Sequence, residues 1–217
     1  MRVENPRARE VFRELVVDYR PGERLANWTS LGVGGTTDVL VAEDARRLPE
    51  LVAWLDGEGV PWRLLGGGTN LLVAEGELPE VVLQFSPRDA GAKFNGQRVH
   101  VNAAADLGRT VTECARQNLG GMEGLIGVPG SVGGALRMNA GAYGTEIGQF
   151  VRSVTLFRAA AGRIEALERD RVSFQYRHTA FAPHDIMVAC ELELPEQPYD
   201  EIRAAIRMCN EKRRASQ

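Results

Sequence analysis

The chain has 217 residues, of which 44% are hydrophobic and 25% charged, and its formal net charge is −3. This length can hold one large domain or two small ones, and the composition is that of an ordinary soluble globular protein. A nucleic-acid partner is not expected, because its binding face would require clustered Lys and Arg. No apolar run approaches the length of a membrane span, so we expect no membrane partner and a cytoplasmic location.

The first part of the chain alternates between helix and strand patterns. Apolar residues at helical spacing predict an amphipathic helix over 6–19, which Pro21 and Gly22 end. Asp44 is expected to cap a second helix that runs to about Gly57. Short apolar runs predict strands at 38–42, 62–65, 71–75 and 81–85. We interpret residues 1–85 as a small α/β lobe.

The rest of the chain, residues 86–217, is richer in patterns of antiparallel strands. The elements predicted there are a strand at 98–104, a helix at 107–118, a hairpin of 151–159 and 162–168, a strand at 185–194 and a helix at 199–214. The tight basic cluster KRR at 212–214 ends the last helix, where cations face the negative end of the helix dipole, and we interpret it as a solvated cap. The expected fold class is α+β, with two lobes.

Two glycine-rich segments point to a bound ligand. The turn GGGTN at 66–70 lies between apolar segments and can form a nest of N–H donors suited to phosphate, although an ordinary hairpin turn is the alternative. It does not match G-x-G-x-x-G, because Leu71 replaces the last glycine. The run 120–144 holds nine of the 24 glycines among apolar residues, which indicates a buried, ordered loop. Together they suggest a cofactor between the lobes.

Four motifs in the same order carry a resemblance to a known family. They are NWTSLGVGG (27–35), LGGGTNLLV (65–73), GLIGVPGSVGGALRMNAGAYG (124–144) and FQYRHTAF (174–181). The chain closely resembles the UDP-N-acetylenolpyruvoylglucosamine reductases, which make precursors of peptidoglycan. This resemblance implies the two-lobed FAD-binding fold of the vanillyl-alcohol-oxidase (PCMH-type) kind.

The resemblance also implies which residues bind FAD. The residues expected at the pyrophosphate are Gly66, Gly67, Gly68, Thr69 and Asn70. The residues expected along the ribityl chain and flavin are Gly124, Ile126, Gly127, Pro129, Gly130, Gly134, Asn139, Gly141 and Ala142.

The chemistry that the resemblance implies is a reduction of a UDP-sugar. Family members transfer a hydride from NADPH through FAD to the enolpyruvyl double bond of the substrate. The enolate formed on the way needs a positive charge beside it, and Arg177 matches the arginine that supplies this charge. For Tyr176, substrate contact and core packing remain equal alternatives.

No metal site is expected, because the three histidines are scattered and the three cysteines are widely spaced without a CxxC motif. Cys190 lies on an apolar strand and is predicted to be inert packing. The same cysteine pattern argues against a disulfide framework.

The chain lacks one part of the family's pattern, and this affects whether the complete reaction or only flavin binding is expected. The family's C-terminal substrate domain, with a proton-donating serine in a G-S-x-F-K-N-P-like motif, has no match in this chain. A shortened chain of an ordinary reductase is favoured over a degenerate paralogue or a chain completed by another polypeptide, because the motifs present show no decay. Two other functions remain open: a non-catalytic or half-reaction flavin-binding module, and an oxidoreductase of the same fold acting on a different sugar or alcohol.

Overall fold

A computed structural model describes Val3 and residues 6–216 and divides the chain into two compact units. Unit 1 comprises the chain up to Asp89 together with Leu156–Glu165 and Ala182–Val188, and unit 2 comprises Ala90–Thr155, Ala166–Phe181 and Ala189–Gln217. The expected division at 85/86 lies close to the first of these breaks. The two later segments belong to unit 1 because they bring buried side chains, among them Phe157 and Ile186, into its core.

Unit 1 is built on a four-stranded sheet with the order β1-β2-β4-β3. Its elements are α1 (Pro6–Glu14), β1 (Val17–Arg24), η1 (Leu25–Asn27), β2 (Thr36–Ala42), η2 (Ala45–Arg47), α2 (Leu48–Gly57), β3 (Trp62–Leu64) and β4 (Val81–Phe85). β1 runs antiparallel to β2, whereas β2 and β3 both pair with β4 in parallel. Such a mixed sheet follows from the alternation of strand and helix in this part of the sequence.

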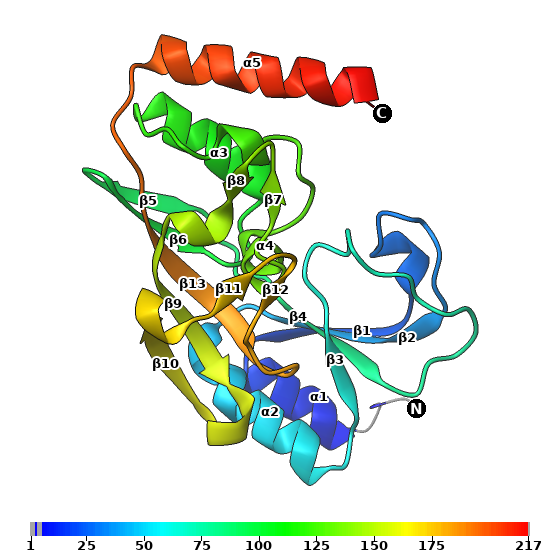
Figure 1. Cartoon of the computed structure of the whole chain (residues 1–217). Coiled ribbons are helices and arrows are strands. Elements are labelled where there is room, and N and C mark those ends of the chain that lie inside the picture. The colour runs from blue at the N-terminus through cyan, green and yellow to red at the C-terminus, as the bar shows by residue number, and fades with distance from the viewer. Residues whose placement is uncertain (1–2, 4–5, 217) are drawn as a thin grey trace. The chain divides into compact units, whose positions relative to one another are not determined.

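Both faces of this sheet are covered by other parts of unit 1. Because side chains alternate along a strand, Leu40 and Leu83 enter one core cluster and Val39 and Val82 enter another. The first cluster contains the apolar sides of α1 and α2, which lie on the same side of the sheet in Figure 1. The second cluster packs against the loops that contain Trp28 and Val73.

Two sequence predictions in unit 1 are wrong. The first helix ends at Glu14 rather than at residue 19, because Val16 takes a left-handed conformation (φ 57°) and the following residues pair with β2 as β1. A register shift between Arg20 and Glu23 accommodates Pro21-Gly22 within that strand. Residues 71–75 form no regular strand, and the side chain of Leu72 is 79% exposed.

Unit 2 contains most of the antiparallel pairs. The remaining elements of the chain are β5 (Ala92–Asn95), β6 (Arg98–Asn102), α3 (Leu107–Arg116), η3 (Glu123–Leu125), α4 (Val132–Arg137), β7 (Gly141–Ala142), β8 (Thr145–Glu146), η4 (Ile147–Gln149), β9 (Val151–Arg158), η5 (Ala159–Ala161), β10 (Arg163–Glu168), η6 (Arg169–Arg171), β11 (Phe174–Gln175), β12 (His178–Thr179), β13 (Ile186–Glu193) and α5 (Tyr199–Ser216). Of these, η5 lies within unit 1, and β9, β10 and β13 each extend into it. A five-stranded sheet has the order β10-β9-β13-β6-β5, and β7-β8 and β11-β12 form separate hairpins. The predicted hairpin turn at 161–162 is present, with Gly162 in the left-handed conformation.

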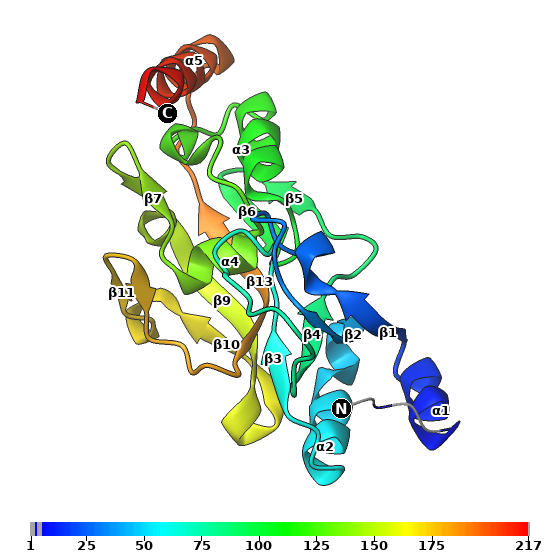
Figure 2. The same cartoon turned by 90° about the vertical axis from the view of Figure 1, so that its right-hand side faces the viewer.

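Helices cover the β5-β6 end of unit 2. Asp106 caps the start of α3, because its carboxylate accepts a hydrogen bond from the N–H of Arg109 (2.7 Å). α3 buries Leu107, Val111 and Cys114. α5 lies next to α3 in both views (Figures 1 and 2) and buries Ile202. α5 also contacts η3, the first turn of the glycine-rich run.

The glycine-rich run is more regular than a loop. Residues 120–144 form η3, α4 and the first strand of the β7-β8 hairpin. Ser131 caps α4 by accepting a hydrogen bond from the N–H of Gly134 (3.2 Å). The N–H groups of Val132 and Gly133 donate to the carbonyls of Ala105 and Ala103 (2.9 and 2.7 Å), so the start of α4 is held beside α3.

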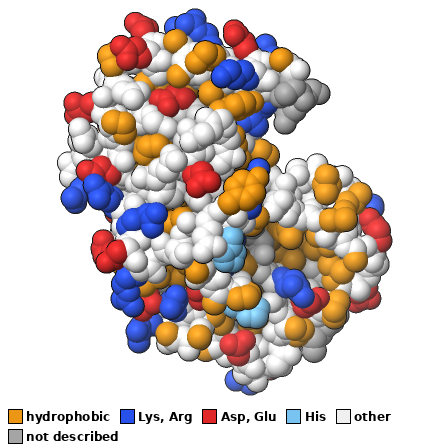
Figure 3. All heavy atoms as spheres, in the orientation of Figure 1, with side chains coloured by type: hydrophobic (Ala, Val, Ile, Leu, Met, Phe, Trp, Pro, Cys, Tyr) orange, Lys and Arg blue, Asp and Glu red, His pale blue; other side chains and the backbone are white. Residues whose placement is uncertain are grey.

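The surface of α5 carries charges of both signs. The sequence of this helix includes Asp200, Glu201, Arg203 and Arg207. Acidic and basic side chains are interspersed over the part of the surface where this helix lies (Figure 3). None of the helices in the described ranges is both long enough and apolar enough to cross a membrane.

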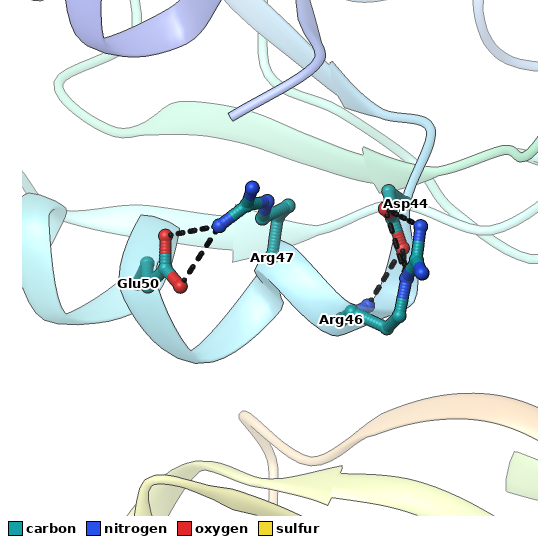
Figure 4. Close-up of polar contacts among 4 residues, drawn as sticks. All are labelled: Asp44, Arg46, Arg47 and Glu50. Atoms are coloured by element: carbon teal, nitrogen blue, oxygen red, sulfur yellow. Dashed lines mark hydrogen bonds and ion pairs between the residues drawn. The ribbon is translucent and has the colours of Figure 1, made fainter. Parts of the chain in front are cut away.

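We predict that the cap before α2 stabilises unit 1. The carboxylate of Asp44 accepts from the backbone N–H of Arg46 (2.9 Å) and also pairs with the Arg46 side chain (Figure 4). Asp44→Ala should lower the free energy of unfolding by about 1 kcal/mol in urea titrations. Hydrogen bonds from Arg46 hold the pKa of Asp44 below its ordinary value, so this stabilisation is present at neutral pH and is lost as the pH falls through the lowered pKa.

The control for this prediction is the neighbouring ion pair between Arg47 and Glu50, also drawn in Figure 4. Both of its side chains are exposed, so Glu50→Ala should change the free energy of unfolding by less than about 0.5 kcal/mol. Equal effects of the two substitutions would contradict a capping role for Asp44.

Candidate functional site

The predicted pyrophosphate turn begins where β3 leaves the sheet of unit 1. The N–H of Leu65 donates to the carbonyl of Leu83 (2.9 Å), and its side chain is buried in the second core cluster. The next two residues, Gly66 and Gly67, are exposed, whereas Gly68 is buried. The turn is therefore anchored at both ends and open in its middle. Thr69 is half-buried and Asn70 is exposed.

Gly68 cannot be replaced by another residue without a clash. Its φ is +66°, and a Cβ atom at this position would overlap the carbonyl oxygen of Trp28. The carbonyl of Gly68 accepts a hydrogen bond from the N–H of Ser30 (3.0 Å), which fixes this close approach. The motif 27–35 thus supports the turn 66–70.

The peptide groups of the turn fit an anionic ligand. The carbonyl of Gly66 accepts a hydrogen bond from the side-chain amide of Gln84 (3.0 Å). In a trans peptide the N–H lies opposite the carbonyl, so the N–H of Gly67 points away from Gln84 on the exposed side of the turn. An exposed glycine turn that directs an N–H outward suits a phosphate group.

In unit 2 the predicted flavin-contacting residues have different accessibilities. Exposed residues are Gly127, Pro129 and Gly134, half-buried ones are Ile126, Gly130, Gly141 and Ala142, and buried ones are Gly124 and Asn139. η3 contacts both strands of the β7-β8 hairpin, so Gly124, Gly141 and Ala142 belong to one packed region. The exposed members offer mainly backbone groups, because they have small side chains or none.

Arg177 lies at the tip of the β11-β12 hairpin. Gln175 pairs with His178, so Tyr176 and Arg177 form a two-residue turn, and both are exposed. Tyr176 is 82% exposed, which argues against the core-packing alternative for this residue. Arg177 has a φ of +55°, a left-handed conformation that costs a non-glycine residue about 1 kcal/mol. Such strain at a turn tip is common among residues with a functional role.

Three hydrogen bonds tie this hairpin and the segment just after it to the end of α4 and the residues that follow α4. The side-chain amide of Asn139 donates to the carbonyl of Gln175 (3.1 Å). The Thr179 hydroxyl donates to the carbonyl of Leu136 (2.7 Å), and the guanidinium of Arg137 donates to the carbonyl of Phe181 (3.1 Å). The end of the glycine-rich run and the Arg177 hairpin therefore form one hydrogen-bonded block.

The Asn139 side chain is occupied within the protein. Besides Gln175, its amide donates to the carboxylate of Glu146 (2.8 Å), and its oxygen accepts from the N–H of Gly148 (3.1 Å). Its side chain thus orders the surrounding chain, and what it can offer a cofactor is its backbone. Sequence reasoning did not single out Thr179, Arg137 or Glu146, because their hydrogen bonds join segments far apart in the chain.

The described cysteines are free and suited to packing. Burial raises the pKa of the Cys114 thiol to about 12 and raises that of Cys190 further. Both thiols are almost fully buried, which supports the interpretation of Cys190 as inert. Within the described ranges, no group of three or more His, Cys, Asp and Glu side chains could hold a metal ion.

Comparison with known proteins identifies the family. Residues 37–168 match the family model of the FAD binding domain. The chain is 35% identical over 194 residues to the UDP-N-acetylenolpyruvoylglucosamine reductase of Pelobacter propionicus, an alignment that covers 89% of this chain and 65% of the relative. The crystal structure of the reductase from Thermus caldophilus superposes with a TM-score of 0.77 at 30% identity, covering 91% of this chain and 69% of that one.

This chain belongs to the UDP-N-acetylenolpyruvoylglucosamine reductase family. It spans 65% of the length of the reductase from P. propionicus. The BBE-like 1 protein of Physcomitrella patens shares the fold, with a TM-score of 0.63 at 13% identity over 87% of this chain and 44% of that one. The predicted α+β, FAD-binding fold of the vanillyl-alcohol-oxidase kind is confirmed, as is the resemblance to the reductase family.

We predict that Gly68 tolerates substitution much less than a glycine with the same backbone angle in open space. Gly68→Ala should lower the free energy of unfolding by about 3 kcal/mol, since it adds an overlap with Trp28 to the backbone strain. Gly59 is the matched control, because its φ is +65° and a Cβ atom added there would have nothing within 4 Å. Gly59→Ala should cost about 1 kcal/mol. Similar values for the two variants in urea titrations would contradict the tight contact with Trp28.

We predict that Asn139 holds the block around the Arg177 hairpin together. Asn139→Ala leaves the N–H of Gly148 and the carbonyl of Gln175 without this partner, so it should lower the free energy of unfolding by about 3 kcal/mol. Asn139→Asp places a second carboxylate beside Glu146, so its destabilisation should be largest at neutral pH and diminish as the pH falls. The exposed Gln117 provides a control, since Gln117→Ala should leave stability within about 0.5 kcal/mol. A pH-independent effect of Asn139→Asp would argue against the contact with Glu146.

Proposed function

We propose that this chain binds FAD and takes part in the NADPH-dependent reduction of UDP-N-acetylglucosamine enolpyruvate to UDP-N-acetylmuramate. The residues proposed for the pyrophosphate are those of the turn 66–70, and those proposed for the ribityl chain and flavin are in the run 124–142. The relatives are named for this reductase activity, and a family model for FAD binding matches residues 37–168. A cytoplasmic location is part of the same proposal.

The observation that carries this proposal is the hydrogen-bonded block that joins α4 to the Arg177 hairpin. The contacts of Asn139, Thr179 and Arg137 hold a positively charged side chain at a defined place beside the glycine-rich run. Arg177 is exposed, so its positive charge is accessible to a bound substrate. A reductase needs it, because charge develops on its substrate during the reaction.

The roles of the chain's own residues follow from this arrangement. When bound, FAD supplies a centre that accepts a hydride and passes it on. The exposed N–H of Gly67 would neutralise part of the charge of the pyrophosphate. The Arg177 guanidinium, carried at the tip of its hairpin, would stabilise the carboxylate of the substrate and the negative charge that develops next to it. The exposed Tyr176 would contact the substrate beside it.

Two stages of the proposal are tested separately, because the chain spans 65% of the length of the P. propionicus relative. The first measurement is the visible spectrum of the purified chain after reconstitution with FAD. The second is anaerobic addition of NADPH, followed by the enolpyruvyl substrate. Absence of bound flavin would overturn the proposal as a whole. Bleaching by NADPH without reoxidation by the substrate would instead support a half-reaction flavin-binding module.

We predict that Arg177 is required for turnover and not for flavin binding. Arg177→Ala should retain the flavin absorbance and slow reoxidation by the enolpyruvyl substrate about 100-fold or more, since one preorganised donor to a developing charge is lost. Arg171, which is exposed on η6 of the same unit, is the control, and Arg171→Ala should leave both properties unchanged. Loss of flavin from Arg177→Ala would assign this arginine a structural role.

A further inference from the structure

Arg213 makes contacts that its position in the sequence does not suggest. It lies in the last turn of α5, where the KRR cluster was expected to be solvated. Lys212 and Arg214 are indeed exposed. Arg213 is half-buried, and its guanidinium donates to the carbonyls of Ile126 (2.9 Å) and Gly127 (2.8 Å) in the glycine-rich run. The interpretation of the whole cluster as a solvated cap is therefore wrong for this residue.

The two carbonyls belong to a type II turn over residues 125–128. Ile126 has φ −58° and ψ 133°, Gly127 has φ +72°, and the N–H of Val128 donates to the carbonyl of Leu125 (3.0 Å). A planar guanidinium carries donors in a fixed fork, so one arginine can bind two neighbouring carbonyls at once. Arg213 therefore fixes the orientation of both peptide groups of the turn.

This orientation leaves one backbone donor directed away from Arg213. The N–H of Gly127 shares a peptide with the Ile126 carbonyl and lies opposite to it. It donates to no other group in the described part of the chain, and Gly127 is exposed. The N–H of Gly127 is thus presented on the side of the turn remote from α5.

The absence of a side chain at position 127 makes room for the arginine. A Cβ atom there would lie 3.1 Å from Nε of Arg213, closer than an ordinary contact. The guanidinium also lies over the ring of Tyr143, 5.6 Å from the ring centre, and Tyr143 lies in the turn of the β7-β8 hairpin. Arg213 therefore connects the 125–128 turn with the segment that follows Gly141 and Ala142.

We propose that Arg213 is a positioning residue of the cofactor site, because it holds the 125–128 turn so that the N–H of Gly127 can donate to an electronegative atom of the cofactor. This inference rests on the proposed binding of FAD by the glycine-rich run. Arg213 itself does not touch the cofactor. Its effect is transmitted through the two carbonyls and through the ring of Tyr143.

The experiment compares three substitutions on α5. In Arg213→Ala the dissociation constant for FAD should rise about tenfold, the loss expected when a charge-assisted pair of hydrogen bonds no longer orders a binding loop. Arg213→Lys keeps the charge without the fork, so its effect should be intermediate. Arg214→Ala removes the neighbouring exposed arginine and should bind FAD as the unaltered chain does. Circular dichroism and thermal unfolding of each apoprotein identify any variant that fails to fold.

Chemical rescue separates positioning from general stability. Guanidinium ion, added well below denaturing concentrations, should restore FAD affinity to Arg213→Ala and not to Arg213→Lys, whereas urea should restore it to neither. Amide hydrogen exchange of the apoproteins gives a second readout that needs no flavin: exchange at residues 124–130 should be faster in Arg213→Ala than in Arg214→Ala.

The outcomes distinguish this inference from the proposed function. If the unaltered chain binds FAD and Arg213→Ala binds it equally well, the positioning role is overturned and the proposed function stands. Unchanged exchange at residues 124–130 in Arg213→Ala would overturn it as well. If the unaltered chain binds no FAD, the proposed function fails, and the inference about Gly127 fails with it.

Discussion

A buried amide determines how the second unit presents its functional hairpin. The side chain of Asn139 has hydrogen-bond partners in the β8 strand, in η4 and at the end of β11. Apolar packing alone is not directional, whereas a buried amide destabilises the fold unless its hydrogen-bond partners occupy particular places. The hydrogen bonds of Asn139, together with those of Thr179 and Arg137, therefore specify the position of the Arg177 hairpin beside the glycine-rich run.

The two predicted cofactor segments use the same physical device, although they lie in different units. In each segment, a side chain from elsewhere in the chain donates a hydrogen bond to a backbone carbonyl. Gln84 donates to the carbonyl of Gly66, and Arg213 donates to that of Ile126. Because the peptide group is planar and trans, binding the carbonyl also directs the adjoining N–H outward. A glycine follows each of these carbonyls, so no side chain at that position shields the donor.

Much of the fold could be predicted from periodicity, and the exceptions have local causes. α2, α3 and β4 were predicted close to their observed bounds because their apolar residues repeat at the spacing of a helix or strand. The first helix was predicted too long because the left-handed turn at Val16 leaves no mark in an apolar pattern. The site motifs indicated which segments matter. They could not show that the Asn139 side chain forms its hydrogen bonds within the protein. Nor could they show that Arg213 binds Gly127, 86 residues earlier in the chain, since both facts depend on tertiary contacts.

The contact between Arg213 and Gly127 has a consequence for how this sequence can vary. A larger residue at position 127 requires the guanidinium to withdraw, and a smaller residue at position 213 removes the need for a glycine on steric grounds. The two positions are thus energetically coupled, so their substitutions should not combine additively. Substitutions at position 127 should therefore be found together with substitutions at position 213 in related sequences.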